Sequence, residues 1–190
     1  MHKIMIHNTT KSILLTFIVF FSLSHSANAQ FSRFGGGLSF STGIENEDHK
    51  TGNPGISARA VIELGDKFWL IPGFSFYMPG KRQHNTYGLA TTLFGSLDAD
   101  FTYTLGSESS LLFYALAGAN LSYLSTKFKS GDAASNMMPA LNIGTGIEMI
   151  VEKDLNGFAQ IKGVIGSYEK YLAISLGVHY YINGRRYKSW

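Results

Sequence analysis

The chain has 190 residues and a formal net charge of +3, with 15% charged residues, 14% aromatic residues and 21 glycines. Average proteins have about 25% charged residues, so this chain is too apolar for intrinsic disorder, and its length suits one domain. The absence of cysteine excludes a disulfide framework, a cysteine-ligated metal site, a thiol nucleophile and a lipid-modified N-terminal cysteine.

Residues 1–29 have the layout of a secretory signal peptide. A basic start without acidic residues precedes the apolar run 13–23, and Ala27 and Ala29 follow in the small-x-small arrangement that a signal peptidase needs. A spanning helix needs about 20 apolar residues, roughly twice this run. We therefore expect cleavage after Ala29 and export of the remaining 161 residues.

Positive charge is not concentrated in the exported chain. Removing Lys3 and Lys11 with the signal leaves 14 Lys and Arg against 13 Asp and Glu. A nucleic-acid-binding surface needs clustered positive charge, and the only basic cluster here is in residues 183–190. We therefore expect no nucleic-acid partner.

After residue 30 the chain alternates apolar and polar residues with a period of two. In 34–41, for example, apolar residues occupy even positions with Gly and Ser between them. Such alternation predicts strands with one apolar and one polar face, and no segment shows a convincing amphipathic helix. The predicted strands are 34–41, 56–64, 68–76, 89–103, 111–124, 141–151, 159–165 and 172–182.

The predicted links alternate in length. Those at 65–67, 106–110 and 152–156 are short, whereas polar segments at 44–54, 78–86 and 125–138 are long, and the last link, 167–170, is short again. Tight periplasmic turns and longer extracellular loops are typical of an up-and-down outer-membrane barrel, whose even strand number brings both ends to the periplasm. We predict an all-β, eight-stranded antiparallel transmembrane barrel over residues 30–182, after the signal peptide 1–29 and before a basic tail, 183–190.

Aromatic residues on the apolar parity gather near the predicted strand ends. Mid-strand positions are instead aliphatic, such as Leu93 and Ile143. Aromatic belts at both membrane interfaces have this distribution. The predicted girdle consists of Phe34, Phe68, Phe101, Tyr103, Phe113 and Tyr180 at the periplasmic end, with Phe40, Phe76, Tyr87 and Tyr123 at the extracellular end.

Charged residues fall on the opposite parity, which in an eight-stranded membrane barrel points into a lumen just wide enough for side chains. Enclosed charges must be paired because an isolated buried ion is very costly. Folding adjacent strands about their turns sets Arg59 near Ile71 or Gly73, where Gly73 leaves room for its guanidinium, and sets Glu148 opposite Gln160 or Lys162. This predicts a Glu148–Lys162 pair, and Arg59 is predicted to meet Asp98 across the barrel. The predicted interior network is Arg59, Glu63, Asp98, Asp100, Glu148, Lys162 and His179.

The last predicted strand carries a motif that supports a family resemblance. Ser175, Gly177, Tyr180 and Ile182 fit the polar-x-Gly-x-x-aromatic-x-hydrophobic pattern that the barrel-assembly machinery reads. With the signal peptide, eight strands and charged interior, the chain resembles the small outer-membrane barrels of the OmpA-transmembrane-domain and OmpX type, often called porin-like. The resemblance implies residence in the outer membrane of a Gram-negative bacterium and contact with the assembly machinery. Unlike this family, the chain continues past the motif with residues 183–190.

These features favour a monomeric outer-membrane protein without catalysis or cofactor. We expect a structural role, or contacts of the acidic loop 45–50 and the basic loop 81–84 with lipopolysaccharide or another extracellular partner. Alternatives are a narrow channel for small or hydrophobic solutes and a soluble lipocalin-like barrel with apolar residues inside.

Barrel enzymes that deacylate lipid A use a His-x-Ser pair, and none of His49, His84 and His179 is followed two residues later by Ser. No metal site is expected, and the glycines at 35–37 precede no helix and indicate close backbone approach or a bulge.

Overall fold

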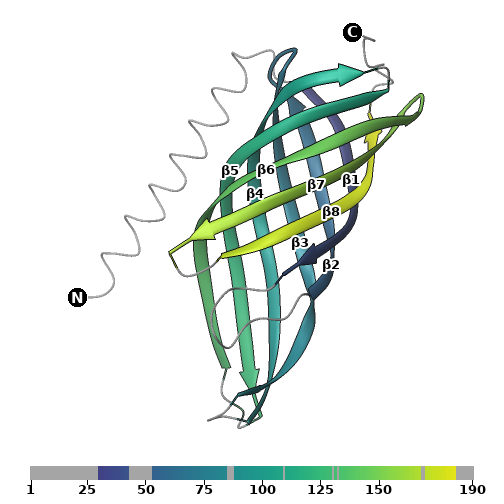
Figure 1. Ribbon diagram of the computed structural model, residues 1–190. Coiled ribbons are helices and arrows are strands. Elements are labelled where there is room, and N and C mark those ends of the chain that lie inside the picture. Colours follow the sequence, from purple (N-terminus) through teal and green to yellow (C-terminus); the bar gives the residue numbers. More distant parts are fainter. Residues whose placement is uncertain are drawn as a thin grey trace.

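The chain folds into a closed barrel of eight strands, which hydrogen-bond in sequence order, and β1 closes the ring by pairing with β8 (Figure 1). All eight neighbouring pairs are antiparallel, so the predicted up-and-down barrel is confirmed. The strands are β1 (Gln30–Ser41), β2 (Asn53–Glu63), β3 (Phe68–His84), β4 (Gly88–Glu108), β5 (Leu111–Phe128), β6 (Ala133–Glu152), β7 (Leu155–Gly166) and β8 (Lys170–Tyr181).

This computed structural model describes residues 30–42, 53–84, 88–108, 110–129, 131, 133–167 and 170–182. Several sequence predictions fall outside the described residues: the signal peptide with Ala27 and Ala29, the loop 45–50, Tyr87 and the tail 183–190. The side chains of 81–84 are also outside the description. Among the described residues, no helix is long and apolar enough to cross a membrane.

The two ends of the barrel differ. We call the end with the β2–β3, β4–β5 and β6–β7 links, where β1 begins and β8 ends, the turn end. The opposite end is called the loop end. The links at the turn end are short, as predicted, with two residues between β6 and β7.

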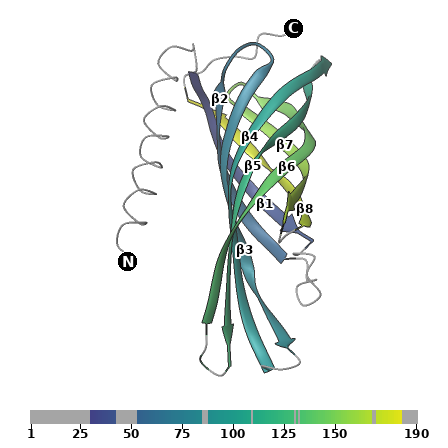
Figure 2. The ribbon, with the colours of Figure 1, turned by 90° about the vertical axis from the view of Figure 1, so that its left-hand side faces the viewer.

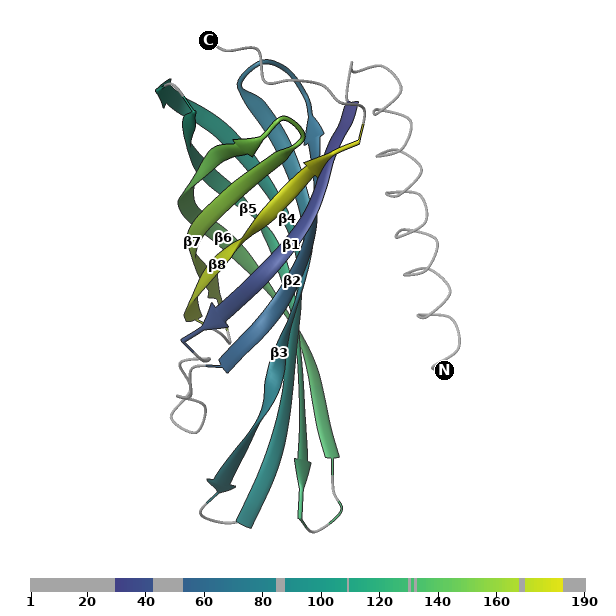
Figure 3. The same ribbon diagram turned by 90° about the vertical axis from the view of Figure 1, so that its right-hand side faces the viewer.

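The prediction of long loops at 78–86 and 125–138 is wrong, because most of these residues are in strands. Beyond Tyr77, β3 pairs only with β4, and before Ala140, β6 pairs only with β5. The two hairpins β3–β4 and β5–β6 therefore project past the barrel (Figures 2 and 3). We call this projecting part the loop-end sheet. Its faces lack the apolar–polar alternation that marks a strand with one buried face.

The barrel wall is apolar outside and mixed inside. Outward side chains in mid-strand are strongly exposed, including Leu38 at 71%, Leu141 at 68% and Ile143 at 61%. Inward positions of the same strands are buried and mostly polar, as at Ser39 and Asn142. This facing is the reverse of a lipocalin-like barrel, which holds its large apolar side chains inside.

Close strand contact at the β1–β8 seam depends on glycine. Gly37 and Gly177 lie opposite each other, and a Cβ on Gly37 would overlap the backbone of Leu176 in β8. The sequence prediction of close backbone approach at 35–37 is therefore confirmed. The bulge lies earlier in β1, between Phe31 and Arg33.

Candidate functional site

The lumen is the candidate site because the buried charged side chains of the described residues meet there. Of the predicted interior network, Arg59, Asp100, Glu148, Lys162 and His179 are at most 9% exposed. The Asp98 side chain is 5% exposed and also points inward. Glu63 differs, because its side chain is 38% exposed at the turn end.

One buried cluster is centred on Glu148 and lies toward the turn end; we call it the Glu148 cluster. The Glu148 Oε1 atom accepts hydrogen bonds from Arg33 Nη1 at 2.5 Å and Asn156 Nδ2 at 3.0 Å, and it lies 3.2 Å from His179 Nδ1. Tyr181 joins the cluster because its hydroxyl lies 3.2 Å from both Arg33 Nη1 and Asn156 Nδ2. The carboxylate thus has several donors in place of water, as a buried charge requires.

Arg33 is the main residue that the sequence prediction missed. Its side chain is completely buried, 4.5 Å from the ring of Trp69, and it is the closest charged partner of Glu148. The bulge in β1 turns both Ser32 and Arg33 inward, and Ser32 Oγ donates to the Val61 carbonyl at 3.2 Å. A bulge re-aims a side chain in this way. Arg33 is on the same parity as the inward Ser39, so counting alternate residues back from Ser39 would have found it.

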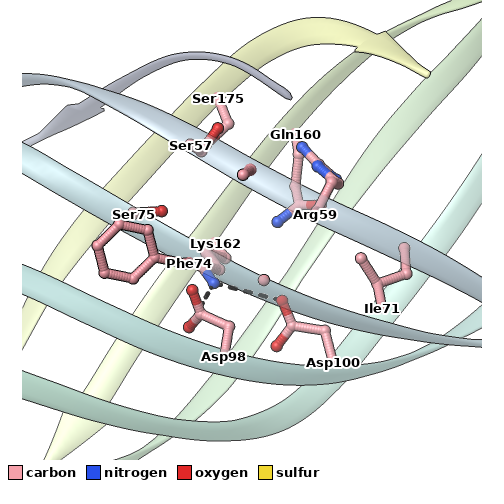
Figure 4. A pocket seen from close by; sticks show the side chains of 12 residues that line it. Ser57, Arg59, Ile71, Phe74, Ser75, Asp98, Asp100, Gln160, Lys162 and Ser175 are labelled. Atoms are coloured by element: carbon pink, nitrogen blue, oxygen red, sulfur yellow. Dashed lines mark hydrogen bonds and ion pairs between the residues drawn. The ribbon is translucent and has the colours of Figure 1, made fainter. Parts of the chain in front are cut away.

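A second cluster, the Lys162 cluster, occupies the middle of the lumen. Lys162 Nζ lies 2.8 Å from Asp98 Oδ1 and 3.3 Å from Asp100 Oδ2 (Figure 4). Asn142 Nδ2 donates to both carboxylates, at 2.9 and 2.6 Å, and Asn120 Nδ2 donates to Asp98 at 2.7 Å. Two adjacent carboxylates are held together by one ammonium group and two amides.

Two predicted ion pairs are wrong. Glu148 is opposite Phe158 and Lys162 is opposite Gly144, so these charges lie at different levels of the barrel and bind other partners. Arg59 does not reach Asp98: its Nη1 donates to Gln160 Oε1 at 2.9 Å, and its guanidinium lies 3.4 Å from the centre of the Phe158 ring. Of the two positions predicted for Arg59, near Ile71 or Gly73, the one opposite Gly73 is confirmed.

The enclosed charges balance. Among the described residues, three buried cations face three buried carboxylates, with Glu63 at the edge of the set. This balance lowers the cost of enclosing ions in a medium of low dielectric constant, and Arg59, which binds Gln160 and the Phe158 ring, is compensated at longer range. The cations are Arg33, Arg59 and Lys162, and the carboxylates are Asp98, Asp100 and Glu148.

The lumen is not polar throughout, because two clusters of apolar side chains accompany the predicted charges. Toward the turn end, one apolar cluster contains Val61, Trp69, Ile71, Leu112, Tyr114 and Leu116. Toward the loop end, a second contains Tyr77, Phe94, Met138, Ala140, Val164, Tyr171 and Ala173. The alternation of residues along each strand missed these side chains. It shows which residues face inward and which face outward, but it does not show which inward residues are apolar.

A small cavity lies between the clusters in the described part of the lumen. A cavity of about 20 Å³ lies beside Arg59, Gln160, Asp98, Asp100 and Lys162 (Figure 4). A buried water needs about 10–15 Å³ on this measure, so the cavity holds about one water. It forms because the inward positions next to it on β2, β3 and β8 are small: Ser57, Gly73, Ser75 and Ser175.

The remaining predicted site residues lie on the barrel wall. Eight of the girdle aromatics are between 39% and 54% exposed and Phe76 is half-buried; Phe34 packs on Tyr180, with ring centres 5.9 Å apart. In the assembly motif, Ser175 and Gly177 face inward and Tyr180 faces outward on β8, and Ile182 follows the strand. Within the described ranges, no group of three His, Asp or Glu side chains is arranged to hold a metal ion.

Solved structures of small outer-membrane barrels share this fold. Ail, the attachment invasion locus protein of Yersinia pestis, superposes with a TM-score of 0.59 and 15% identity over 80% of this chain and 97% of that chain. The N-terminal β-barrel domain of Pseudomonas aeruginosa OprF gives 0.56 and 18% over 82% and 100%, and Neisserial surface protein A gives 0.59 and 15% over 80% and 98%. Ail has also been solved in complex with the heparin analogue sucrose octasulfate, with a TM-score of 0.60 and 15% identity over 80% of this chain and 100% of that chain.

No protein-family model matches the chain, and no curated protein matches it. The resemblance to small outer-membrane barrels is confirmed at the level of the fold.

Proposed function

We propose that the chain is a monomeric, non-catalytic outer-membrane protein that contacts partners outside the cell through its loop-end sheet. The apolar outer wall of a closed barrel is the observation that supports membrane residence most strongly. A closed ring leaves no strand edge for lipid to meet, and exposed side chains such as Leu38 and Leu141 suit hydrocarbon rather than water. The turn end would then face the periplasm and the loop end the exterior.

The filled lumen favours a structural role over transport. Two apolar clusters and the paired charges occupy the described part of the interior, and the cavity beside Arg59 holds about one water, which is too small for a solute. The buried ion pairs hold the wall strands to one another from within. On this proposal the porin-like resemblance does not imply free diffusion.

Lys127 and Lys129 lie exposed at the end of β5, and Lys170 is exposed at the start of β8. The sequence also has acids in the links at this end, at Glu45, Glu47, Asp48, Asp132 and Glu169, so the positive charge is local to the exposed lysines. A local group of positive charges attracts anionic partners over a Debye length of about 10 Å in 0.1 M salt. The complex of Ail with a sulfated heparin analogue supports an anionic glycan, such as the phosphorylated core of lipopolysaccharide, as the partner class.

The last strand and the N-terminal residues carry the expected signals for assembly and export. The motif from Ser175 to Ile182 lies on β8, at the closing seam, where the assembly machinery would read it. Residues 1–29 would direct export and be removed after Ala29.

Cell fractionation and conductance test the membrane role. We expect the protein in the outer-membrane fraction, soluble only with detergent, with a gel mobility that changes on boiling. In planar bilayers we expect no discrete openings. Recovery as a soluble monomer in plain buffer contradicts membrane residence, and reproducible conductance steps contradict the filled lumen.

Binding to lipopolysaccharide tests the partner class. We expect the folded protein to bind intact lipopolysaccharide more tightly than the dephosphorylated form, with an affinity that falls as salt rises. Lys127→Ser with Lys129→Ser should weaken binding, whereas Lys67→Ser at the turn end serves as the matched control. Equal binding by both variants contradicts the proposed surface.

A further inference from the structure

The outer face of the loop-end sheet continues the face of the barrel wall that the proposed function places against lipid. At this end β5 pairs with β4 and with β6 without a register shift, so inward and outward side chains alternate without interruption from Leu121 to Lys127 (Figures 2 and 3). Odd-numbered residues of this part of β5 therefore face outward, above the wall, and even-numbered residues such as Thr126 face inward.

Three successive rows of neighbouring residues on this outer face differ in chemistry. The row nearest the barrel is apolar, the next carries two serine hydroxyls, and the third carries one ammonium group. Read from β4 through β5 to β6, the rows are Gly95, Tyr123 and Met137, then Leu93, Ser125 and Ser135, and then Thr91, Lys127 and Ala133. A strand rises about 3.4 Å per residue, so successive rows are about 7 Å apart along β5.

The charge of the loop-end sheet lies on its outer face. Lys127 is exposed, and it is the one charged group among the side chains that the structure describes in the strands of this sheet. No ion pair joins it to another described residue. The neighbouring inward row is uncharged, and the hydroxyls of Thr92 and Thr126 lie 3.5 Å apart there. The ammonium group is therefore directed toward the membrane side of the sheet rather than toward its inner face.

The height of Lys127 corresponds to the headgroup region of a bilayer. Four residues separate it from Tyr123 of the predicted aromatic girdle, which is about 14 Å along the strand and about 10 Å along the membrane normal for a strand tilted by about 40°. The polar layer on each side of the hydrocarbon is about 5–8 Å thick. A lysine stem can bend its ammonium group back toward this layer. The charge therefore lies where lipid phosphates are, close to the surface of the membrane.

We propose that the outer face of the loop-end sheet binds the phosphorylated end of a glycolipid in its own leaflet, with a phosphate at Lys127, sugar hydroxyls at the serine row and acyl chains against the apolar row. This inference rests on the proposed function and deepens it, because it names the acylated, phosphorylated sugar that anchors lipopolysaccharide (lipid A) as the bound part. Charge complementarity supports this occupant, since an ammonium group is a common ligand of phosphate. The order of the three rows matches the order of acyl chain, sugar and phosphate.

Energy transfer to labelled lipid A tests this placement in the folded full chain. The donor is a single tryptophan on the outer face, Tyr123→Trp, in a chain that also carries Trp69→Phe and Trp190→Phe. The acceptor is lipid A with a dansyl group on one acyl chain, diluted in phosphatidylcholine bilayers. We expect the phosphorylated form to associate more tightly than the same molecule without phosphates. Lys127→Ser should weaken association of the phosphorylated form about three- to fivefold, and salt at about 1 M should do the same.

Moving the lysine by one or two residues provides matched controls for its facing. Lys127→Ser with Ser125→Lys keeps the charge on the outer face and should retain most of the association. Lys127→Ser with Thr126→Lys has the same net charge on the inner face and should behave like Lys127→Ser alone. Each variant is checked for the gel mobility of the folded barrel, so that a misfolded variant is not scored.

Three outcomes overturn the proposal. Equal recovery with lysine at 125 and at 126 would mean that the facing of the charge does not matter. Equal association of labelled phosphatidylglycerol would mean that the face attracts any anionic lipid. Association that ignores the phosphates, while intact lipopolysaccharide is still preferred over the dephosphorylated form in the earlier binding assay, would mean that the partner is the outer carbohydrate. Failure of the proposed partner class itself differs from this last result, because it abolishes the preference in both assays.

Discussion

Removing the charge of Glu148 is expected to destabilise the barrel strongly, because it takes the carboxylate at 2.5 Å away from a fully buried cation. In Glu148→Gln, the completely buried Arg33 loses this partner, and another carboxylate, Glu63, is 3.8 Å away and 38% exposed. Breaking a buried ion pair by removing one partner costs about 3–5 kcal/mol. We expect a loss of this size in the free energy of unfolding.

The double variant distinguishes pairing from packing. Arg33→Met leaves Glu148 with Asn156 and His179 as partners, so it should cost less than Glu148→Gln. Arg33→Met with Glu148→Gln removes both charges and should recover part of the loss, with a coupling energy of about 2–3 kcal/mol.

Unfolding in urea, followed by the change in gel mobility of lipid-embedded protein, measures these differences by linear extrapolation. Additivity of the two single substitutions within about 0.5 kcal/mol would refute the pairing argument.

Three further predictions follow from the packing of the lumen and the loop-end sheet. Gly146→Ala should destabilise the barrel by about 1–3 kcal/mol in the urea assay, because its Cβ would overlap the Tyr114 ring. Lys162→Met should cost more than Arg59→Met, because Lys162 separates two carboxylates whereas Arg59 contacts an amide and a ring. Replacing residues 126–134 by a short turn should leave the urea midpoint of the barrel unchanged, because these strand residues lie in the loop-end sheet and pair only with each other and with the start of β4.

Each of these predictions has a control and a contrary result. Gly65→Ala, where a Cβ meets nothing within 4 Å, should be neutral, and an equal effect at both glycines would refute the steric argument. A larger loss for Arg59→Met than for Lys162→Met would contradict the assigned ion pairs. A lower midpoint after the hairpin is shortened would mean that the loop-end sheet stabilises the barrel.

The strands and their facing could be predicted from the sequence because one physical rule governs both. A wall between lipid and a narrow interior imposes a period of two, as in 141–151, where Leu, Ile and Met alternate with Asn, Gly and Glu. The loop-end sheet was not predicted because apolar and polar residues need not alternate in a strand whose two faces both meet solvent. Residues 133–138 read as a polar loop, although they continue β6.

The pairing of the interior charges could not be predicted from the register of neighbouring strands. Hairpin geometry set Arg59 near Ile71 or Gly73, and it lies opposite Gly73, but the partner of Glu148 is 115 residues away, on a strand that is not adjacent to β6. Contacts across a lumen depend on strand tilt and side-chain length. The one-residue bulge before Arg33 also has no marker in the sequence pattern.

Quenching of tryptophan fluorescence by brominated phosphatidylcholine tests the central claim most directly, namely that apolar side chains meet lipid while the lumen is sealed. The chain has two tryptophans, so Trp190→Phe leaves only Trp69, which is 5% exposed in the lumen. Adding Trp69→Phe and Leu97→Trp instead places the reporter at an outward position that is 55% exposed. We predict strong quenching at position 97 and little at position 69. Strong quenching at 69, or quenching at 97 by aqueous iodide rather than by the brominated lipid, would contradict the account.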